Sequence, residues 1–340
     1  MNFSYLLIIP LLIVSINFIL NKNNFLQSLT GDKHQLFIEK NNVPLSGGVI
    51  LFILSIFFFI EKMDFFYFLI IFLIGILSDI KILKSAKIRF LLQGITIFFL
   101  VVNFDLYVND IRVPLINYLL EHTIFSYIFF TFCLLIVTNG TNFIDGLNGL
   151  VINYYLLILI LIFNMEVITE TMNIRVLILS YIILLIYLLL FNLLNKLYLG
   201  DSGSYLLGVS IGSLLIFIYK EISFISPFFI VLLLWYPCFE NLFSIIRKKR
   251  FNLSPLNADN KHLHHLLFHY INSNHNFTKI FSNNVSSVLI NLVNVIFFVI
   301  GANHVNNSLI QIILIFSLIL IYISTYLILF KYRYKKFFNH

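Results

Sequence analysis

The chain has 340 residues, 60% of them hydrophobic and 11% charged, with a mean hydropathy of +0.97 and a net charge of +7. This composition excludes a water-soluble globule, a collagen-like or disordered chain and a disulfide scaffold. The positive charge does not indicate nucleic-acid binding, because basic loops beside anionic lipid headgroups are expected of membrane proteins. The sequence therefore predicts an integral protein of the inner (plasma) membrane, surrounded by lipid.

Eleven apolar runs follow one another along the chain, and each is interpreted as a membrane-crossing helix. Several runs are short for a full crossing, so we expect ten or eleven spans. The predicted fold class is all-α, a polytopic membrane helix bundle that forms one domain over residues 1–340. The runs cover residues 3–20, 45–60, 65–79, 89–104, 123–138, 149–164, 174–194, 203–219, 224–246, 284–301 and 307–330.

Basic residues give the orientation, because Lys and Arg are retained on the cytosolic side during insertion. The first run has no basic residue before it and no small-residue cleavage site after it, so we expect it to stay as a span. With the N-terminus outside and the C-terminus cytosolic, the cytosolic segments hold 18 of the 22 Lys and Arg residues. The predicted cytosolic loops are 21–44, 80–88, 139–148, 195–203 and 247–283.

The first polar feature is the entry to the second run, where VPLSGGV places Gly47 and Gly48 after a proline. Taken alone, this entry is a tight turn. The third run ends at Asp79, which is followed by several cations that include Lys87 and Arg89. A carboxylate among cations at the interface suits a lipid phosphate. Alternatively, the cations are interface anchors and Asp79 is a cap or an ion-pair partner.

The stretch NGTNFIDGLNGL spans residues 139–150 and carries Asn139, Asn142, Asp145 and Asn148 three residues apart. This spacing places the four side chains along one side of a helical turn or two. Their oxygen atoms suit a hard cation. The alternative is a polar helix end in which Asn and Asp act as caps.

YLGDSGS, residues 198–204, places Asp201 in a glycine-rich turn that begins an apolar helix. The backbone amides of such a helix start can bind phosphate. Its serines could instead be simple N-caps.

The longest cytosolic loop contains RKKRFNLSPLNADNKHLHH, residues 247–265, with four consecutive basic residues and then His262, His264 and His265. It suits an anionic, phosphate-bearing group. A zinc site is a weaker alternative, because no cysteine or carboxylate lies at matching spacing. Positive-inside retention explains part of the basic run.

These five stretches, in this order and on one face, resemble the polyprenyl-phosphate N-acetylhexosamine-1-phosphate transferases, also called glycosyltransferase family 4. This superfamily includes phospho-MurNAc-pentapeptide translocase and the undecaprenyl-phosphate GlcNAc-1-phosphate transferases. The resemblance covers most of residues 31–270. GILSDIK takes the place of the family's paired-aspartate motif, with Ser78 at the first aspartate, and Asn148 stands where bacterial members usually have the last aspartate of Asn-x-x-Asn-x-x-Asp-Gly-x-Asp-Gly.

The resemblance implies a role for each of the singled-out residues. It implies Mg²⁺, with Mn²⁺ as an alternative, held mainly by Asp201 with help from Asn142. It implies catalytic roles for Asp79, Asp145 and Asp201. The implied substrate-binding residues are Gly47, Gly48, Lys87 and Arg89 for the prenyl phosphate, and Asn139, Asn148, Arg250, Lys261, His262, His264 and His265 for the UDP-sugar.

The implied reaction is transfer of an N-acetylhexosamine-1-phosphate from a UDP-N-acetylhexosamine such as UDP-GlcNAc to undecaprenyl phosphate, with release of UMP. This would be the first membrane step of a cell-surface glycan, such as lipopolysaccharide O-antigen or cell wall. Two other interpretations stay open, a non-catalytic descendant that binds lipid phosphate and a membrane transporter. A transporter would place its polar groups near the bilayer midplane and show repeated halves, which the sequence lacks. The sequence leaves open whether the protein forms a homodimer.

Overall fold

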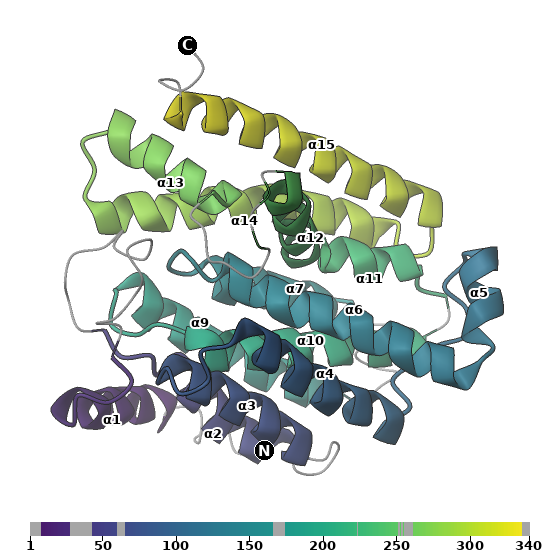
Figure 1. The fold of residues 1–340 in the computed structure, drawn as a ribbon, viewed down its shortest axis with the longest axis horizontal. Coiled ribbons are helices and arrows are strands. Elements are labelled where there is room, and N and C mark those ends of the chain that lie inside the picture. Colours follow the sequence, from purple (N-terminus) through teal and green to yellow (C-terminus); the bar gives the residue numbers. More distant parts are fainter. Residues whose placement is uncertain are drawn as a thin grey trace.

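A computed structural model describes residues 8–27, 43–59, 65–165, 174–222, 224–250, 252, 254 and 261–334. These residues form fourteen α-helices and no strand beyond one isolated bridge, which confirms the all-α fold class (Figure 1). The helices are α1 (Ile8–Lys22), α2 (Gly47–Phe59), α3 (Phe65–Asp79), α4 (Ala86–Asn103), α5 (Pro114–Leu120), α6 (Thr123–Ile144), α7 (Leu150–Phe163), α9 (Arg175–Leu193), α10 (Gly200–Glu221), α11 (Pro227–Leu233), α12 (Trp235–Arg250), α13 (Leu263–Asn274), α14 (Lys279–Asn303) and α15 (Ser308–Arg333).

Each of the eleven predicted runs contains a helix, and the ninth contains both α11 and α12. Several boundaries differ by a few residues, α5 lies outside the predicted runs, and two differences are larger. Helix α6 continues to Ile144, into the segment predicted as a cytosolic loop, and α13 forms within the predicted loop 247–283. The predicted loop 21–44 lies largely outside the described residues.

Among the described residues, six helices are long and apolar enough to cross a membrane, namely α4, α6, α9, α10, α14 and α15, and the bent pair α11 and α12 makes a seventh. The protein is therefore a multi-pass membrane protein. Helices α1, α2, α3 and α7 have only 13–15 residues. At about 1.5 Å per residue they are shorter than a hydrocarbon core of about 30 Å. The number of ten or eleven spans stays a prediction.

Hydrogen bonds connect helix ends and loops into two groups, one at each end of the bundle. At one end, Asn17 donates to the Lys196 carbonyl and Asn284 donates to the Leu193 carbonyl. At the other end, Arg112 donates to the carbonyls of Asn306 and Phe224. The same two groups are predicted on opposite membrane faces if successive runs cross the membrane in alternating directions. Which of the two ends is cytosolic stays a prediction.

Helix α10 lies at the centre of the bundle, because 83% of its most apolar stretch is buried. It packs against α6, α3 and α2. Small residues permit this packing, because a Cβ at Gly208 would lie 2.8 Å from Cα of Thr138 on α6. Membrane helices commonly use small residues for close backbone approach, since lipid gives no hydrophobic drive for their association.

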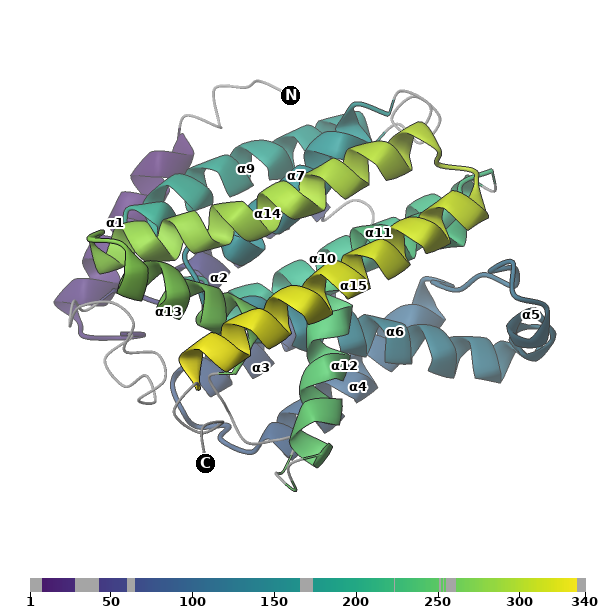
Figure 2. The same cartoon turned by 90° about the horizontal axis from the view of Figure 1, so that it is seen from above.

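The ninth run is broken by a bend of 72° between α11 and α12. In Figure 2, α12 turns away from the direction of the long helices α14 and α15. The backbone at the bend is satisfied by Tyr154, whose hydroxyl donates to the Leu233 carbonyl at 2.7 Å and accepts from the Tyr236 amide at 3.4 Å. Such replacement bonds matter because an unsatisfied backbone group is costly at membrane depth.

Candidate active site

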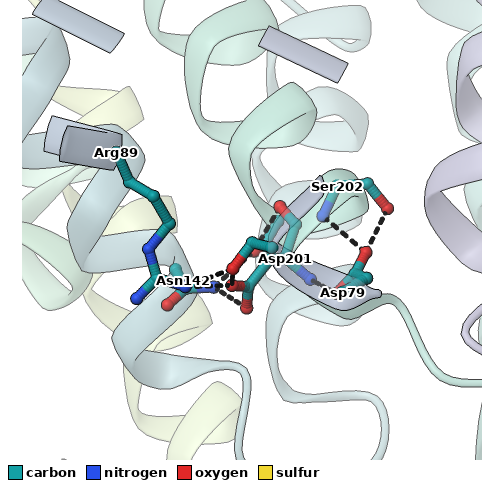
Figure 3. A network of polar contacts seen from close by, with 7 residues as sticks. Asp79, Arg89, Asn142, Asp201 and Ser202 are labelled. Carbon is teal, nitrogen blue, oxygen red and sulfur yellow. Dashed lines mark hydrogen bonds and ion pairs between the residues drawn. The ribbon is translucent and has the colours of Figure 1, made fainter. Parts of the chain in front are cut away.

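The carboxylate of Asp201 is the centre of a polar cluster formed by the ends of three helices and the first turns of α4 (Figure 3). Its Oδ1 accepts a hydrogen bond from Nδ2 of Asn142 at 2.7 Å. Its Oδ2 accepts from Oγ of Ser78 at 2.5 Å and from Nη1 of Arg89 at 3.1 Å. The side chains of Asp201 and Arg89 are 30% and 25% exposed, so a ligand can reach the ion pair.

Asp79 faces the same turn but makes different contacts. Its Oδ1 accepts the Asp201 amide at 2.8 Å, and its Oδ2 accepts the amide and the hydroxyl of Ser202 at 3.1 and 2.7 Å. The last residue of α3 therefore caps the first turn of α10, where backbone N–H groups have no partner within their own helix. This geometry favours a positioning role for Asp79 over the predicted catalytic role.

Glycines bring α2 and α3 close to the Asp201 turn. A Cβ at Gly75 would lie 2.2 Å from Cα of Ser202, and a Cβ at Gly48 would lie 2.5 Å from the amide nitrogen of Gly203. The amides of Gly47 and Gly48 donate to the carbonyls of Tyr198 and Leu199 at 3.0 Å. These amides are therefore engaged within the protein, and the predicted role of Gly47 and Gly48 in binding a phosphate stays a prediction.

The three other residues that the sequence singled out in the stretch 139–150 occupy different environments. Asn139 donates to Oε1 of Gln93 at 3.1 Å. Asn148 is buried, and its backbone amide donates to Oδ1 of Asn283 at 2.7 Å. Asp145 follows α6, and burial raises the pKa of its carboxyl well above the ordinary range, with Asp201 and Asp79 raising it further. Only Asp145 thus joins Asn142 and Asp201 in one electrostatic cluster.

The histidines lie close together at the start of α13. Nδ1 of His262 lies 2.8 Å from Oε1 of Glu240, and the ring of His264 lies 4.1 Å from that of His265. His264 is fully buried, and neither of its ring nitrogens has a hydrogen-bond partner in the described part of the chain. Burial lowers the pKa of His264 well below its ordinary value, and the charges of His265 and His262 lower it further.

The histidines also adjoin the segment that follows α6. A Cβ at Gly146 would lie 2.4 Å from Nε2 of His264. The sequence prediction that the histidine loop and the 139–150 stretch share one region therefore agrees with the geometry.

The basic side chains at the end of α12 differ in their exposure. Arg250, which the sequence singled out, is exposed, as is Lys87 on α4. Arg247 and Lys248 are instead buried, and Nζ of Lys248 lies 5.7 Å from the centre of the Phe143 ring. Nζ of Lys261 lies 5.9 Å from the Tyr334 ring.

Sequence reasoning missed Ser202, Glu240, Arg247 and Lys248. One signal could have found Glu240 and Arg247, because Glu240, Ser244 and Arg247 recur at helical spacing on one face of α12 and all are buried. The role of Ser202 had no signal in the sequence, since its partner Asp79 is more than a hundred residues away.

The described residues contain no group of three His, Cys, Asp or Glu side chains that would hold a metal by itself. Mg²⁺ commonly takes only one or two carboxylates from the protein and completes its shell with water and substrate phosphates. Asp201 fits this pattern, because its carboxylate is 30% exposed and its Oδ1 lies 2.7 Å from the side-chain amide of Asn142. The amide of Asn142 would present its oxygen after a simple flip.

A comparison with protein families matches residues 63–219 to Glycosyl transferase family 4. The matched segment runs from the residues before α3 to the end of α10, so it includes Asp79, Asn142 and Asp201.

Relatives of known name are similar to the chain as well. A probable undecaprenyl-phosphate N-acetylglucosaminyl 1-phosphate transferase of Bacillus subtilis is 34% identical over 202 residues, 58% of this chain and 55% of the relative. An undecaprenyl-phosphate alpha-N-acetylglucosaminyl 1-phosphate transferase of Thermotoga maritima is 27% identical, over 66% of this chain and 67% of the relative. A phospho-N-acetylmuramoyl-pentapeptide-transferase of Staphylococcus saprophyticus is also 27% identical, over 74% and 85%. The first match thus spans about half of that relative's length.

Proposed function

We propose that the chain, whose residues 63–219 match glycosyl transferase family 4, transfers an N-acetylhexosamine-1-phosphate from a UDP-sugar to undecaprenyl phosphate. The observation that carries the proposal is the contact of Asp201 with Asn142, Ser78 and Arg89 at one end of the bundle. Arg89 and Asp201 are 25% and 30% exposed, so phosphate groups can contact them.

The proposed reaction joins two anions. An oxygen of undecaprenyl phosphate attacks the β-phosphorus of the UDP-sugar and forms a new P–O bond. The P–O bond to the α-phosphate breaks, its electron pair leaves with UMP, and a lipid-linked sugar diphosphate remains. Because attacker and target repel each other, the site must neutralise charge and align the groups.

Asp201 and Asn142 are the residues that would hold Mg²⁺, with Mn²⁺ as a substitute. When bound, the ion would supply charge neutralisation at the diphosphate. Arg89 supplies the same kind of neutralisation from the protein. Its guanidinium already lies 3.1 Å from Asp201, so it is placed to contact a phosphate that enters beside that carboxylate.

The protonated fraction of the lipid phosphate also needs an acceptor for its proton. Asp145 suits this role, because burial raises the pKa of its carboxyl well above the ordinary range. Asp79 is less suited, since its carboxylate accepts three hydrogen bonds from the start of α10. We therefore assign Asp145 to proton transfer and Asp79 to positioning.

We propose that the UDP-sugar binds beside His262, His264 and His265. His264 offers two buried ring nitrogens that have no partner in the described chain, beside Gly146. Lys248 and Lys261 place positive charge in the same region. We further propose UDP-GlcNAc as donor and the cytosolic face of the plasma membrane as the site of reaction. A cell-surface glycan such as O-antigen or cell wall would be the product's destination.

The test measures UMP release by the purified protein in detergent, supplied with undecaprenyl phosphate, Mg²⁺ and a panel of UDP-N-acetylhexosamines. UMP release with at least one donor, lost in Asp201→Asn, is the expected result. The matched control is Glu221→Gln, an exposed carboxylate at the far end of the same helix, which keeps wild-type release. No UMP from any donor with monodisperse, folded protein would overturn the transferase and favour a lipid-phosphate-binding descendant.

A further inference from the structure

Glu240 is a fully buried carboxylate on α12 that the proposed reaction does not use. Both of its oxygens are engaged. Oε1 lies 2.8 Å from Nδ1 of His262, and Oε2 accepts a hydrogen bond from the Tyr322 hydroxyl at 2.5 Å. A buried carboxylate is costly unless it is paired and hydrogen-bonded, so this pair of bonds explains how Glu240 is tolerated.

The contact with Glu240 decides which nitrogen of His262 carries a proton. A carboxylate has only acceptor atoms, so the hydrogen between it and His262 sits on Nδ1. A bond at Nδ1 also fixes the plane and direction of the imidazole ring. Nε2, on the opposite side of the ring, then points away from Glu240.

The ring of His262 lies between Glu240 and the proposed donor site. It stacks on His264 with a centroid distance of 5.5 Å and an angle of 18°, and it lies 5.9 Å from the Phe143 ring. Phe143 is the neighbour of Asn142 in α6. Any rotation of His262 would therefore disturb the stack that holds the buried His264 beside Gly146.

Tyr322 connects this arrangement to α15, a helix outside the segment that matches the family. Its ring is buried and lies 4.9 Å from that of Phe239 and 5.3 Å from that of Phe243, both on α12. The hydroxyl is thus held in place by packing, and it holds Oε2 of Glu240 in turn.

We propose that Glu240, held by Tyr322, is a positioning residue for the donor half of the site. It fixes His262 with a proton on Nδ1 and so keeps the stacked His262 and His264 rings in place for the sugar diphosphate of the donor. This inference rests on the proposed function for the identity of the ligand, but the contact between Glu240 and His262 can be tested without it.

Steady-state kinetics test the coupling. Glu240→Gln keeps the shape of the side chain but removes its charge, and we expect a loss of roughly 10- to 100-fold in kcat/KM for the UDP-sugar. KM for undecaprenyl phosphate stays within about twofold of wild type. Tyr322→Phe removes one hydroxyl and causes a smaller loss of the same kind. Tyr332→Phe, the same change at an exposed position of α15, leaves the kinetics unchanged.

A double-mutant cycle shows whether Glu240 acts through His262. In the His262→Asn background, Glu240→Gln should cause no further loss, because the partner is already gone. Losses that multiply in the double variant would overturn the proposal, as would equal damage to the KM values of both substrates. Thermal unfolding of each variant identifies any that fail to fold, and Tyr322→Phe then takes the place of Glu240→Gln.

A spectroscopic measurement separates this inference from the proposed function. ¹⁵N NMR of histidine-labelled protein, with His262 assigned from the His262→Asn spectrum, reports which ring nitrogen carries the proton. We expect a protonated Nδ1 in wild type and a changed Nδ1 signal in Glu240→Gln. Wild-type His262 with a proton on Nε2 alone would overturn the inference. A protonated Nδ1 in protein that releases no UMP would support the contact while the transferase fails.

Discussion

The carboxylate of Asp79 accepts the backbone amide of Asp201 at 2.8 Å, so that the end of α3 caps the start of α10. The two aspartates therefore make different contacts, although both lie in the same cluster. Asp201 is partly exposed and pairs with Arg89, and Asp79 accepts hydrogen bonds from the turn that carries Asp201.

Asp79→Asn should weaken both the fold and the activity. The amide keeps one acceptor oxygen but loses charge, and the loss of a cap costs about 1 kcal/mol of the free energy of unfolding. We expect a lower melting temperature in detergent and a reduced kcat, because the Asp201 turn loses its support. Asp105→Asn, at the opposite end of the bundle, serves as the control. An unchanged melting temperature combined with complete loss of kcat would indicate a catalytic role instead.

Arg89→Gln should weaken binding of the lipid phosphate. A charge-assisted hydrogen bond contributes about 1.5–3 kcal/mol, so KM for undecaprenyl phosphate should rise roughly 10- to 100-fold. Initial rates at varied acceptor and saturating donor concentration provide the measurement. Lys84→Gln removes the same charge from an exposed position just before α4 and should keep the wild-type KM. An effect confined to KM for the UDP-sugar would place Arg89 in the donor site.

Gly75→Ala should prevent α3 from approaching α10. The new Cβ would lie 2.2 Å from Cα of Ser202, and backbone atoms cannot move aside cheaply. Overpacking of this kind costs about 1–3 kcal/mol or more. Gly94→Ala is the matched control, because its Cβ would meet only Leu135 Cδ1 at 3.6 Å. Thermal unfolding should show a large loss for the first variant and an unchanged or higher midpoint for the second.

Acid should destabilise the protein through His264. Burial lowers the pKa of this histidine well below its ordinary value of 6.5, so the unfolded chain binds a proton that the folded chain does not. Above about pH 6.5, neutral His264 does not reduce the free energy of unfolding. Below this pH the unfolded chain takes up the proton, so the free energy of unfolding declines as the pH falls.

Melting temperatures across this pH range test the prediction, with His264→Asn as the variant. Its melting temperature should decline less steeply with acid than that of wild type. His275→Asn, an exposed histidine at the end of α13, should keep the wild-type decline. Equal slopes for wild type and His264→Asn would contradict the prediction.

The sequence predicted the fold class, and the polar stretches that it singled out supply the candidate site. Apolar runs separated by polar ends mark the helices, and each of the eleven runs does contain one. Hydropathy and spacing are properties of single segments, so they need no knowledge of neighbouring helices. They could not show that α12 bends by 72° from α11, because the replacement bonds come from Tyr154 on α7.

Only the tertiary structure distinguished the roles of similar side chains. Asp79, Asp145 and Asp201 are equal candidates in the sequence, but one caps a helix, one is partly buried with a raised pKa, and one pairs with Arg89. Likewise, Arg250 is exposed while Arg247, in the same basic run, is buried. The physical reason is that the partners of a carboxylate or a guanidinium come from segments far along the chain, and only helix packing brings them within hydrogen-bond distance.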